Sequence, residues 1–352
     1  MAQAYLPNTL PLQPLALDTA ALLRQSLEDI VLENPPLDKY EETLNGLAAG
    51  PTALAYLFLQ MAQKHADLQI QGHECMYWAE KYINGDRGPQ EIRDKNCGLV
   101  CEKLAFAAVK ASITQDDRDV AAFLDNVPRL LASTLEGAEN PFPIEMLYGR
   151  AALLYMLRMV KRFVPTSADS ANEAIDKFCQ KILATRDNSK GDWLWNGKRY
   201  YGAPHGDMGI IRQIVLSDPS LAPKLTARLE ELLDLQTETG NWPDTDEQRE
   251  DADRRVQFCH GAPGFIFALQ SLRPFYPEFQ QSALPRGERR EHFVSLAMPD
   301  SLANLTTQHP GLFLDGSYGF SSSPLLSYSP SAAWTWSVLN DAERRIILFN
   351  DI

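Results

Sequence analysis

The sequence has no apolar run long enough to cross a bilayer and no excess of basic residues. A membrane span takes about 18 consecutive apolar residues, and the N-terminal stretch MAQAYLPNTLPLQPLALDTAALL lacks both such a run and the basic start of a secretory signal. The formal net charge is −13, whereas nucleic acid and anionic membranes select clustered Lys and Arg. We therefore expect a cytoplasmic protein that binds a small molecule or a peptide, with no nucleic-acid partner and no integral membrane segment.

Cysteine is also scarce. The chain of 352 residues has five cysteines, an odd and widely scattered set that does not suit a disulfide framework. In a reducing compartment a cysteine is a buried small hydrophobe, a nucleophile or a metal ligand. Cys259 stands apart because it lies beside His260 in the motif VQFCHGAPGF.

Apolar residues follow the helical period, and no comparable stretch alternates with period two. Helical spacing of apolar residues is found in TALAYLFLQMAQK, AALLYMLRMVKRFV, LAPKLTARLEELLDLQ and GFIFALQSL. This pattern predicts an all-α protein.

A glycine-bearing turn recurs before the apolar segments at intervals of 48 to 57 residues, at Gly50, Gly98, Gly149, Gly206, Gly261 and Gly316. A period near 50 with one turn and one apolar helix per unit is typical of stacked helical hairpins, none of which buries its apolar face alone. Polar residues lie in or near these turns, namely Glu145, His205, Asp207, Cys259 and Asp315. If the hairpins close into a ring, we expect these side chains to converge on one rim.

Four stretches, IEMLYGRAALLY, YYGAPHGDMGI, LLDLQTETGNWP and VQFCHGAPGF, resemble the lanthionine synthetase C-like family, in particular its fungal and other eukaryotic members. The resemblance runs from about Gly50 to the C-terminus, and GNWP followed by CHGAPG is a specific combination. It implies an α/α toroid, usually of seven hairpins, with a central zinc ion. It also implies a cyclase or thiol transferase, which adds a peptide cysteine or glutathione to an electrophilic alkene.

The resemblance also implies roles for particular residues. Cys259 would be a zinc ligand. The histidine of CHGAPG is not a ligand in the family, and His260 is a second candidate only if the turn directs both side chains inward. His205 would be the acid/base residue and Arg255 a contact for an anion or a peptide, while Glu145 lies near an acidic position of the family. A turn-capping role for His205 and a structural role for the Cys259 thiol remain open.

The sequence departs from the family pattern after CHGAPG. No cysteine follows Cys259, so the Cys-His pair expected in the next repeat is missing and the zinc site is incomplete. We expect six repeats in residues 38–352, preceded by an N-terminal arm of residues 1–37.

Other functions are compatible with this departure. The carboxylates of Glu145, Asp207 and Asp315 suit Mg²⁺, and through it a diphosphate, as in a cyclase acting on an isoprenoid diphosphate. A zinc-free binding scaffold and an incomplete gene model or splice form are two further interpretations.

Overall fold

The structure is a computed structural model. It describes residues 18–40, 44–132, 134–135, 138–139, 142–185, 187–238, 240–248, 258–277, 328–341, 345, 347–349 and 351–352. The arm residues 1–17 and the segment 278–327 lie outside the described part.

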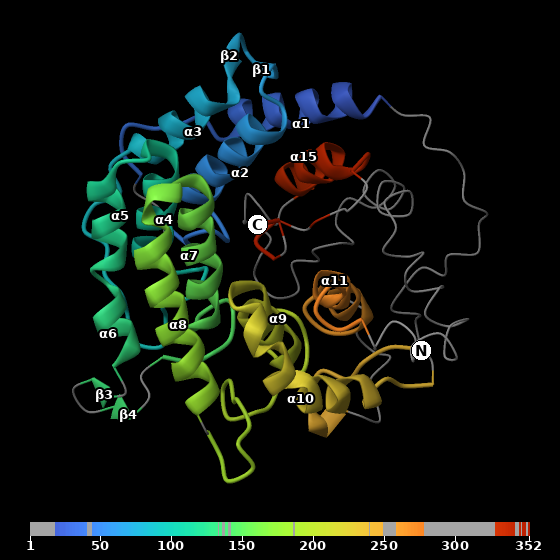
Figure 1. Cartoon of the computed structure of the whole chain (residues 1–352). Coiled ribbons are helices and arrows are strands. Elements are labelled where there is room, and N and C mark those ends of the chain that lie inside the picture. The colour runs from blue at the N-terminus through green and yellow to red at the C-terminus, as the bar shows by residue number, and fades with distance from the viewer. Residues whose placement is uncertain are drawn as a thin grey trace.

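The described part is built from α-helices in two layers (Figure 1). The inner helices are α2 (Pro51–Lys64), α4 (Glu102–Thr114), α7 (Ala151–Phe163), α9 (Asp207–Ser217), α11 (Ala262–Leu272) and α15 (Tyr328–Val338). Each packs against the next from α2 to α11, and α15 packs against α2.

A second set of helices covers this inner layer from outside. The outer helices are α1 (Thr19–Glu33), α3 (Cys75–Asn84), α5 (Asp117–Leu124), α6 (Val127–Leu131), α8 (Ala168–Ala184) and α10 (Ala222–Asp234). In the strongest pairings α3, α5, α8 and α10 pack on the inner helices that precede them in the chain, whereas α1 packs on α15, the last described helix. The first and last described helices are therefore neighbours in space (Figure 1).

The remaining regular elements are short. Two 3₁₀ turns, Pro165–Ser167 and Pro219–Leu221, precede α8 and α10. Two antiparallel pairs of two-residue strands, β1 (Gln69–Ile70) with β2 (His73–Glu74) and β3 (Thr134–Leu135) with β4 (Ala138–Glu139), form hairpins between helices.

The two layers differ in how their sequences are buried. In α7 every residue from Ala151 to Val160 is buried, as suits a helix enclosed on all sides. The outer helix α8 buries only one stripe, made of Ala171, Ala174, Ile175, Phe178, Cys179 and Ile182. This spacing of three and four residues is the helical period that the sequence displays.

Glycines permit the sharp entry into inner helices. Gly50 and Gly261 precede α2 and α11 with φ angles of 90° and 114°, a region that a side chain disfavours. The turns are joined by backbone hydrogen bonds: Leu47 N–H donates to Leu99 O, Leu99 N–H to Met146 O, and Met146 N–H to Pro204 O. Successive turns therefore form one continuous rim at the start of the inner helices.

The all-α class and the double-layered toroid arrangement predicted from the sequence are confirmed. The expected sixth turn at Gly316 lies outside the described residues, so six repeats remain a prediction. The division into an arm of residues 1–37 and a domain of residues 38–352 also remains a prediction. None of the described helices has the length and apolar character that a bilayer span requires.

Candidate functional site at the rim of turns

Glu145 and His205 meet on the rim. Glu145 lies in the turn before α7 and His205 in the turn before α9, and the backbone hydrogen bond from Met146 to Pro204 holds the two turns together. His205 Nδ1 lies 2.7 Å from Glu145 Oε2. The sequence predicts convergence of these two side chains, and the structure brings them together.

The Glu145 carboxylate is held by its own turn. Only 1% of Glu145 is exposed, and its oxygens accept hydrogen bonds from the backbone N–H groups of Leu147 and Tyr148. These donors orient the carboxylate toward His205. With Glu145 Oε2 as acceptor, His205 donates its Nδ1–H, and the lone pair of a neutral imidazole then lies on Nε2. Among the described residues, the imidazole makes its hydrogen bond at Nδ1 alone.

Aromatic rings fix the plane of the imidazole. The Trp195 ring stacks on His205 with centroids 3.8 Å apart and planes 6° apart, and the Tyr148 ring stacks with Trp195 at a centroid distance of 6.1 Å. The Tyr200 ring lies 6.0 Å from the His205 ring. The His205 side chain keeps 11% of its surface exposed, so the ring is clamped but still reaches solvent.

The CHGAPG turn lies beside this pair. A Cβ at Gly202 would come within 2.2 Å of Cys259 O, so the turn that carries His205 and the turn that carries Cys259 touch. The His205 and His260 rings lie 6.3 Å apart. The GNWP segment is bonded to the CHGAPG turn, because Asn241 Oδ1 accepts a hydrogen bond from Ala262 N–H at 2.7 Å.

Cys259 is a poor nucleophile in this surrounding. Burial of the thiol, with a smaller effect of Asp244, raises its pKa from about 9 to about 12. The Cys259 thiol is therefore protonated at neutral pH unless a metal ion or another cation binds it.

The described donors near Cys259 do not form a metal site. His260 Nδ1 lies 3.8 Å from Asp244 Oδ1, but the described part of the chain contains no group of three His, Cys, Asp or Glu side chains that could hold one ion. Zinc sites in proteins use at least three protein donors. Zinc at Cys259 and His260, and Mg²⁺ at the carboxylates, therefore stay predictions.

Asp207 lies in a different environment from Glu145. It is the first residue of α9, its side chain is fully buried, and it contacts two guanidinium groups. Arg199 donates to Asp207 Oδ2 at 2.7 and 2.9 Å, while Arg228 of α10 donates to both oxygens at 2.9 and 3.1 Å.

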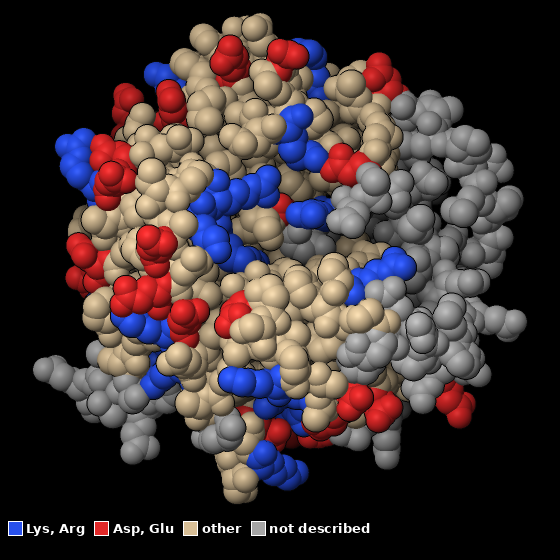
Figure 2. All heavy atoms as spheres, viewed as in Figure 1, with Lys and Arg blue, Asp and Glu red and all other residues tan. Residues whose placement is uncertain are grey.

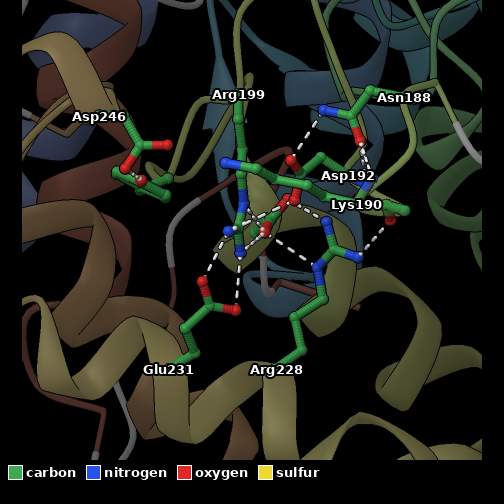
Figure 3. A network of polar contacts seen from close by, with 10 residues as sticks. Asn188, Lys190, Asp192, Arg199, Arg228, Glu231 and Asp246 are labelled. Carbon is green, nitrogen blue, oxygen red and sulfur yellow. Dashed lines mark hydrogen bonds and ion pairs between the residues drawn. The ribbon is translucent and has the colours of Figure 1, made fainter.

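Arg199 also forms an ion pair with a partly exposed residue of α10. Arg199 pairs with Glu231 of α10 at 2.6 Å, and Arg228 and Glu231 approach Arg199 from the same helix (Figure 3). With both oxygens occupied by guanidinium groups, Asp207 joins the start of α9 to the preceding loop and to α10. Among the described residues, the Asp207 side chain makes no hydrogen bond or ion pair with Glu145 or His205.

Two predicted site residues, Arg255 and Asp315, lie outside the described residues. Two residues that contact the predicted site residues, Trp195 and Arg228, were not predicted from the sequence. Trp195 stacks on His205, and the only sequence signal was its place in the aromatic segment WLWNGKRYY. Arg228 neutralises Asp207 from 21 residues further along the chain, and nothing in the sequence pattern pairs the two.

The fold and the rim define a class of protein: an α/α toroid whose inner-helix turns bring a buried carboxylate, a histidine and a Cys-His turn together. A model of the lanthionine synthetase C-like protein family matches residues 45–284, and the chain belongs to this family.

A curated relative gives a more distant comparison. "Glutathione S-transferase LANCL1" from Danio rerio is 26% identical to this chain over 249 residues, which are 66% of this chain and 56% of the relative. The chain therefore matches little more than half the length of that relative.

Proposed function

We propose that the protein is a thiol transferase that adds the thiol of glutathione or of a peptide cysteine to an electrophilic alkene, such as a dehydrated residue in a peptide. The observation that carries this proposal is the 2.7 Å contact between Glu145 and His205 at the rim of a lanthionine synthetase C-like toroid. The name of the zebrafish relative supports glutathione as the thiol. The proposal includes a cytoplasmic location and a fungal or other eukaryotic type of chain with one repeat fewer than usual.

The proposed reaction needs one proton to move from sulfur to carbon. The thiol of the substrate loses its proton to His205 Nε2, and the resulting thiolate attacks the β-carbon of the alkene. The π electrons shift toward the neighbouring carbonyl and form an enolate. The imidazolium then returns the proton to the α-carbon, so the thiol and the alkene combine without loss of any atom.

Glu145 acts on this reaction through His205. Its carboxylate orients the ring through Nδ1 and stabilises the imidazolium that forms between the two proton transfers. Trp195 adds a second stabilising contact, because the face of an indole attracts a cation. Both effects are largest while the imidazole is charged.

A zinc ion bound at Cys259 would supply activation of the substrate thiol by lowering its pKa. Because the described residues place no set of three donors there, the steps above assign the proton transfer to His205 alone. Metal content of the purified protein, measured by mass spectrometry for wild type and Cys259→Ala, separates the two forms of the proposal. Stoichiometric zinc that disappears on substitution favours the zinc-dependent form, and its absence favours the histidine-dependent form.

The activity test is formation of a glutathione adduct on a peptide that contains dehydroalanine. We expect wild type to form the adduct, and His205→Ala to form it about 100-fold or more slowly, the usual range for loss of an acid/base residue. The matched control is His73→Ala, since His73 is an exposed histidine of β2 that stacks on Tyr77. No adduct with wild type, or equal rates for wild type and His205→Ala, would overturn the proposal.

The diphosphate-cyclase alternative has no comparable support. It relies on Glu145, Asp207 and Asp315 as Mg²⁺ ligands. Both Asp207 oxygens contact guanidinium groups, the Glu145 oxygens contact backbone N–H groups and His205, and Asp315 lies outside the described residues.

A further inference from the structure

A second polar cluster lies on the inner helices, beyond the turns that carry the rim. It consists of Arg158 on α7, and of Arg212 and Gln213 on α9, all three buried. Arg212 comes five residues after the start of α9 at Asp207, which is about 7.5 Å along a helix axis. The cluster is therefore separate from the Glu145–His205 pair.

Arg212 is fully buried, with an exposure of 0%. Among the described residues, none of its three guanidinium nitrogens has a hydrogen-bond partner. The guanidinium lies over the Phe349 ring, 3.3 Å from the centroid. This contact covers one face of the guanidinium and leaves its N–H groups, which lie at the edge, without acceptors.

The two neighbours of Arg212 in the cluster are only partly satisfied. Arg158 Nη1 donates to Gln213 O at 3.2 Å and to Ser217 Oγ at 2.8 Å. Within the described part of the chain, Nε and Nη2 of Arg158 and both amide atoms of the Gln213 side chain have no partner. Buried polar groups without a partner are rare in native proteins, because each costs the free energy of its lost hydration.

The charge of nearby Asp351 acts to raise the pKa of both arginines, but Asp351 makes no hydrogen bond to either of them among the described residues. Asp351 accepts hydrogen bonds from the Tyr56 and Tyr155 hydroxyl groups at 2.7 and 3.0 Å and from Gln60 Nε2 at 3.0 Å. Burial raises the pKa of Asp351, which reduces its value as a counterion. Burial, and next the charge of Arg158, lower the pKa of Arg212. The two arginines thus repel one another, and five of their guanidinium nitrogens have no acceptor among the described residues, although Gln213 Oε1 is itself unpaired.

We propose that Arg212, Arg158 and Gln213 form a subsite for the oxyanion group, carboxylate or phosphate, of a small ligand that enters the centre of the ring. A guanidinium fork matches two oxygens of a carboxylate or phosphate. The face of the molecule drawn in Figure 2 has a central hollow bordered by Lys and Arg side chains, which suits the approach of an anion. The subsite goes beyond the proposed thiol addition and does not depend on His205.

The test uses the full chain and two probes, glutathione for a carboxylate and inorganic phosphate for a phosphate. Thermal unfolding is followed while each probe is added at constant ionic strength, with KCl as the reference salt. We expect at least one probe to raise the Tm of wild type, because a ligand that binds only the folded state stabilises it. The probe that acts identifies the source of the oxyanion.

The variant Arg212→Met keeps the length of the side chain and removes the charge. We expect its Tm without ligand to be at least as high as that of wild type, since a buried unpaired charge is lost, and we expect no response to either probe. Arg118→Met is the matched control, because Arg118 is an exposed arginine paired locally with Asp116; it should respond as wild type does.

A second substitution keeps the test decisive if Arg212→Met does not fold. Gln213→Leu removes one donor and should weaken the apparent affinity for the active probe about tenfold, the effect of one lost hydrogen bond to a charged group. His205→Ala should bind the probe as wild type does even if it is inactive. A wild type that responds to neither probe beyond KCl would overturn the subsite, as would an undiminished response of Arg212→Met or, if that variant does not fold, of Gln213→Leu.

Discussion

Glu145 and Asp207 are both buried acids beside turns of the same rim, yet their partners differ. Glu145 contacts two backbone N–H groups and one imidazole, whereas Asp207 contacts two guanidinium groups. A guanidinium is charged at every physiological pH, and an imidazole is the side chain that exchanges its proton near neutrality. Asp207 is therefore suited to hold the fold, and Glu145 to assist proton transfer.

The structural use of an acid at a helix start occurs twice. Glu102 is the first residue of α4, as Asp207 is of α9, and it too is buried against an arginine, with Arg87 Nε 3.0 Å from its Oε1. A negative side chain at this position also favours the N-terminus of the helix. Glu102 and Asp207 are thus both buried at the start of an inner helix. Whether a buried acid of the rim can assist proton transfer depends on its partner, a guanidinium or an imidazole.

Removing the charge of Asp207 should have the largest effect on stability. Asp207→Asn leaves Arg199 and Arg228 without their buried counterion, and we expect the free energy of unfolding to fall by about 3 kcal/mol or more. Chemical denaturation of wild type and variant measures the change. A loss below about 1 kcal/mol would show that Asp207 does not hold α9 in place. It would contradict the distinction between a structural Asp207 and a functional Glu145.

Removing the charge of Glu145 should act mainly on the rate. Glu145→Gln keeps the shape of the side chain but no longer favours a proton on Nδ1 of His205, and we expect adduct formation to slow by about 10-fold or more. The matched comparison is Asp207→Asn, assayed under conditions in which it is folded, which should retain a rate within about 3-fold of wild type. Equal losses of rate in both variants would contradict separate roles.

The pH dependence of the unfolding free energy should show whether Cys259 is a protonated thiol or a metal-bound thiolate. The folded pKa of about 12 lies above the ordinary value, so the thiol contributes stability that is present below about pH 9 and is lost as the pH rises toward 12. The advantage of wild type over Cys259→Ala in unfolding free energy should shrink between pH 8 and pH 10.5. A bound metal would depress this pKa, and the advantage would instead be lost as the pH falls.

The smallest effect is expected at the exposed end of the arginine network. Glu231 contacts the same Arg199 as Asp207 does, but its side chain is 52% exposed. Glu231→Gln should lower the unfolding free energy by less than about 1 kcal/mol, as is usual for exposed ion pairs. If Glu231→Gln lost as much unfolding free energy as Asp207→Asn under the same conditions, the exposed ion pair would contribute as much stability as the buried one, contrary to this prediction.

The sequence predicted the architecture well because helical periodicity and recurrent turns are local signals. The apolar stripe of α10 and the turns at Gly50 and Gly261 are visible without coordinates. The neighbourhood of Glu145 and His205 follows from the same repeat, since equivalent turns meet on one rim.

The partners of individual side chains could not be predicted in this way. Asp207 was grouped with Glu145 because both are acids near a turn, and only the packing of α10 on α9 brings Arg228 to it. The stacking of Trp195 on His205 depends on the path of the loop before α9. Nothing in the sequence distinguishes Arg212, which has no hydrogen-bond partner among the described residues, from other basic residues of a helical segment.

The stereochemistry of the adduct tests the role of His205 most directly. Protonation of the enolate by a fixed imidazole reaches one face of the α-carbon, whereas solvent reaches both. We expect wild type to produce a single epimer at the α-carbon of the former dehydroalanine, and the residual product of His205→Ala to be a mixture. Equal amounts of both epimers from wild type would contradict proton delivery by His205.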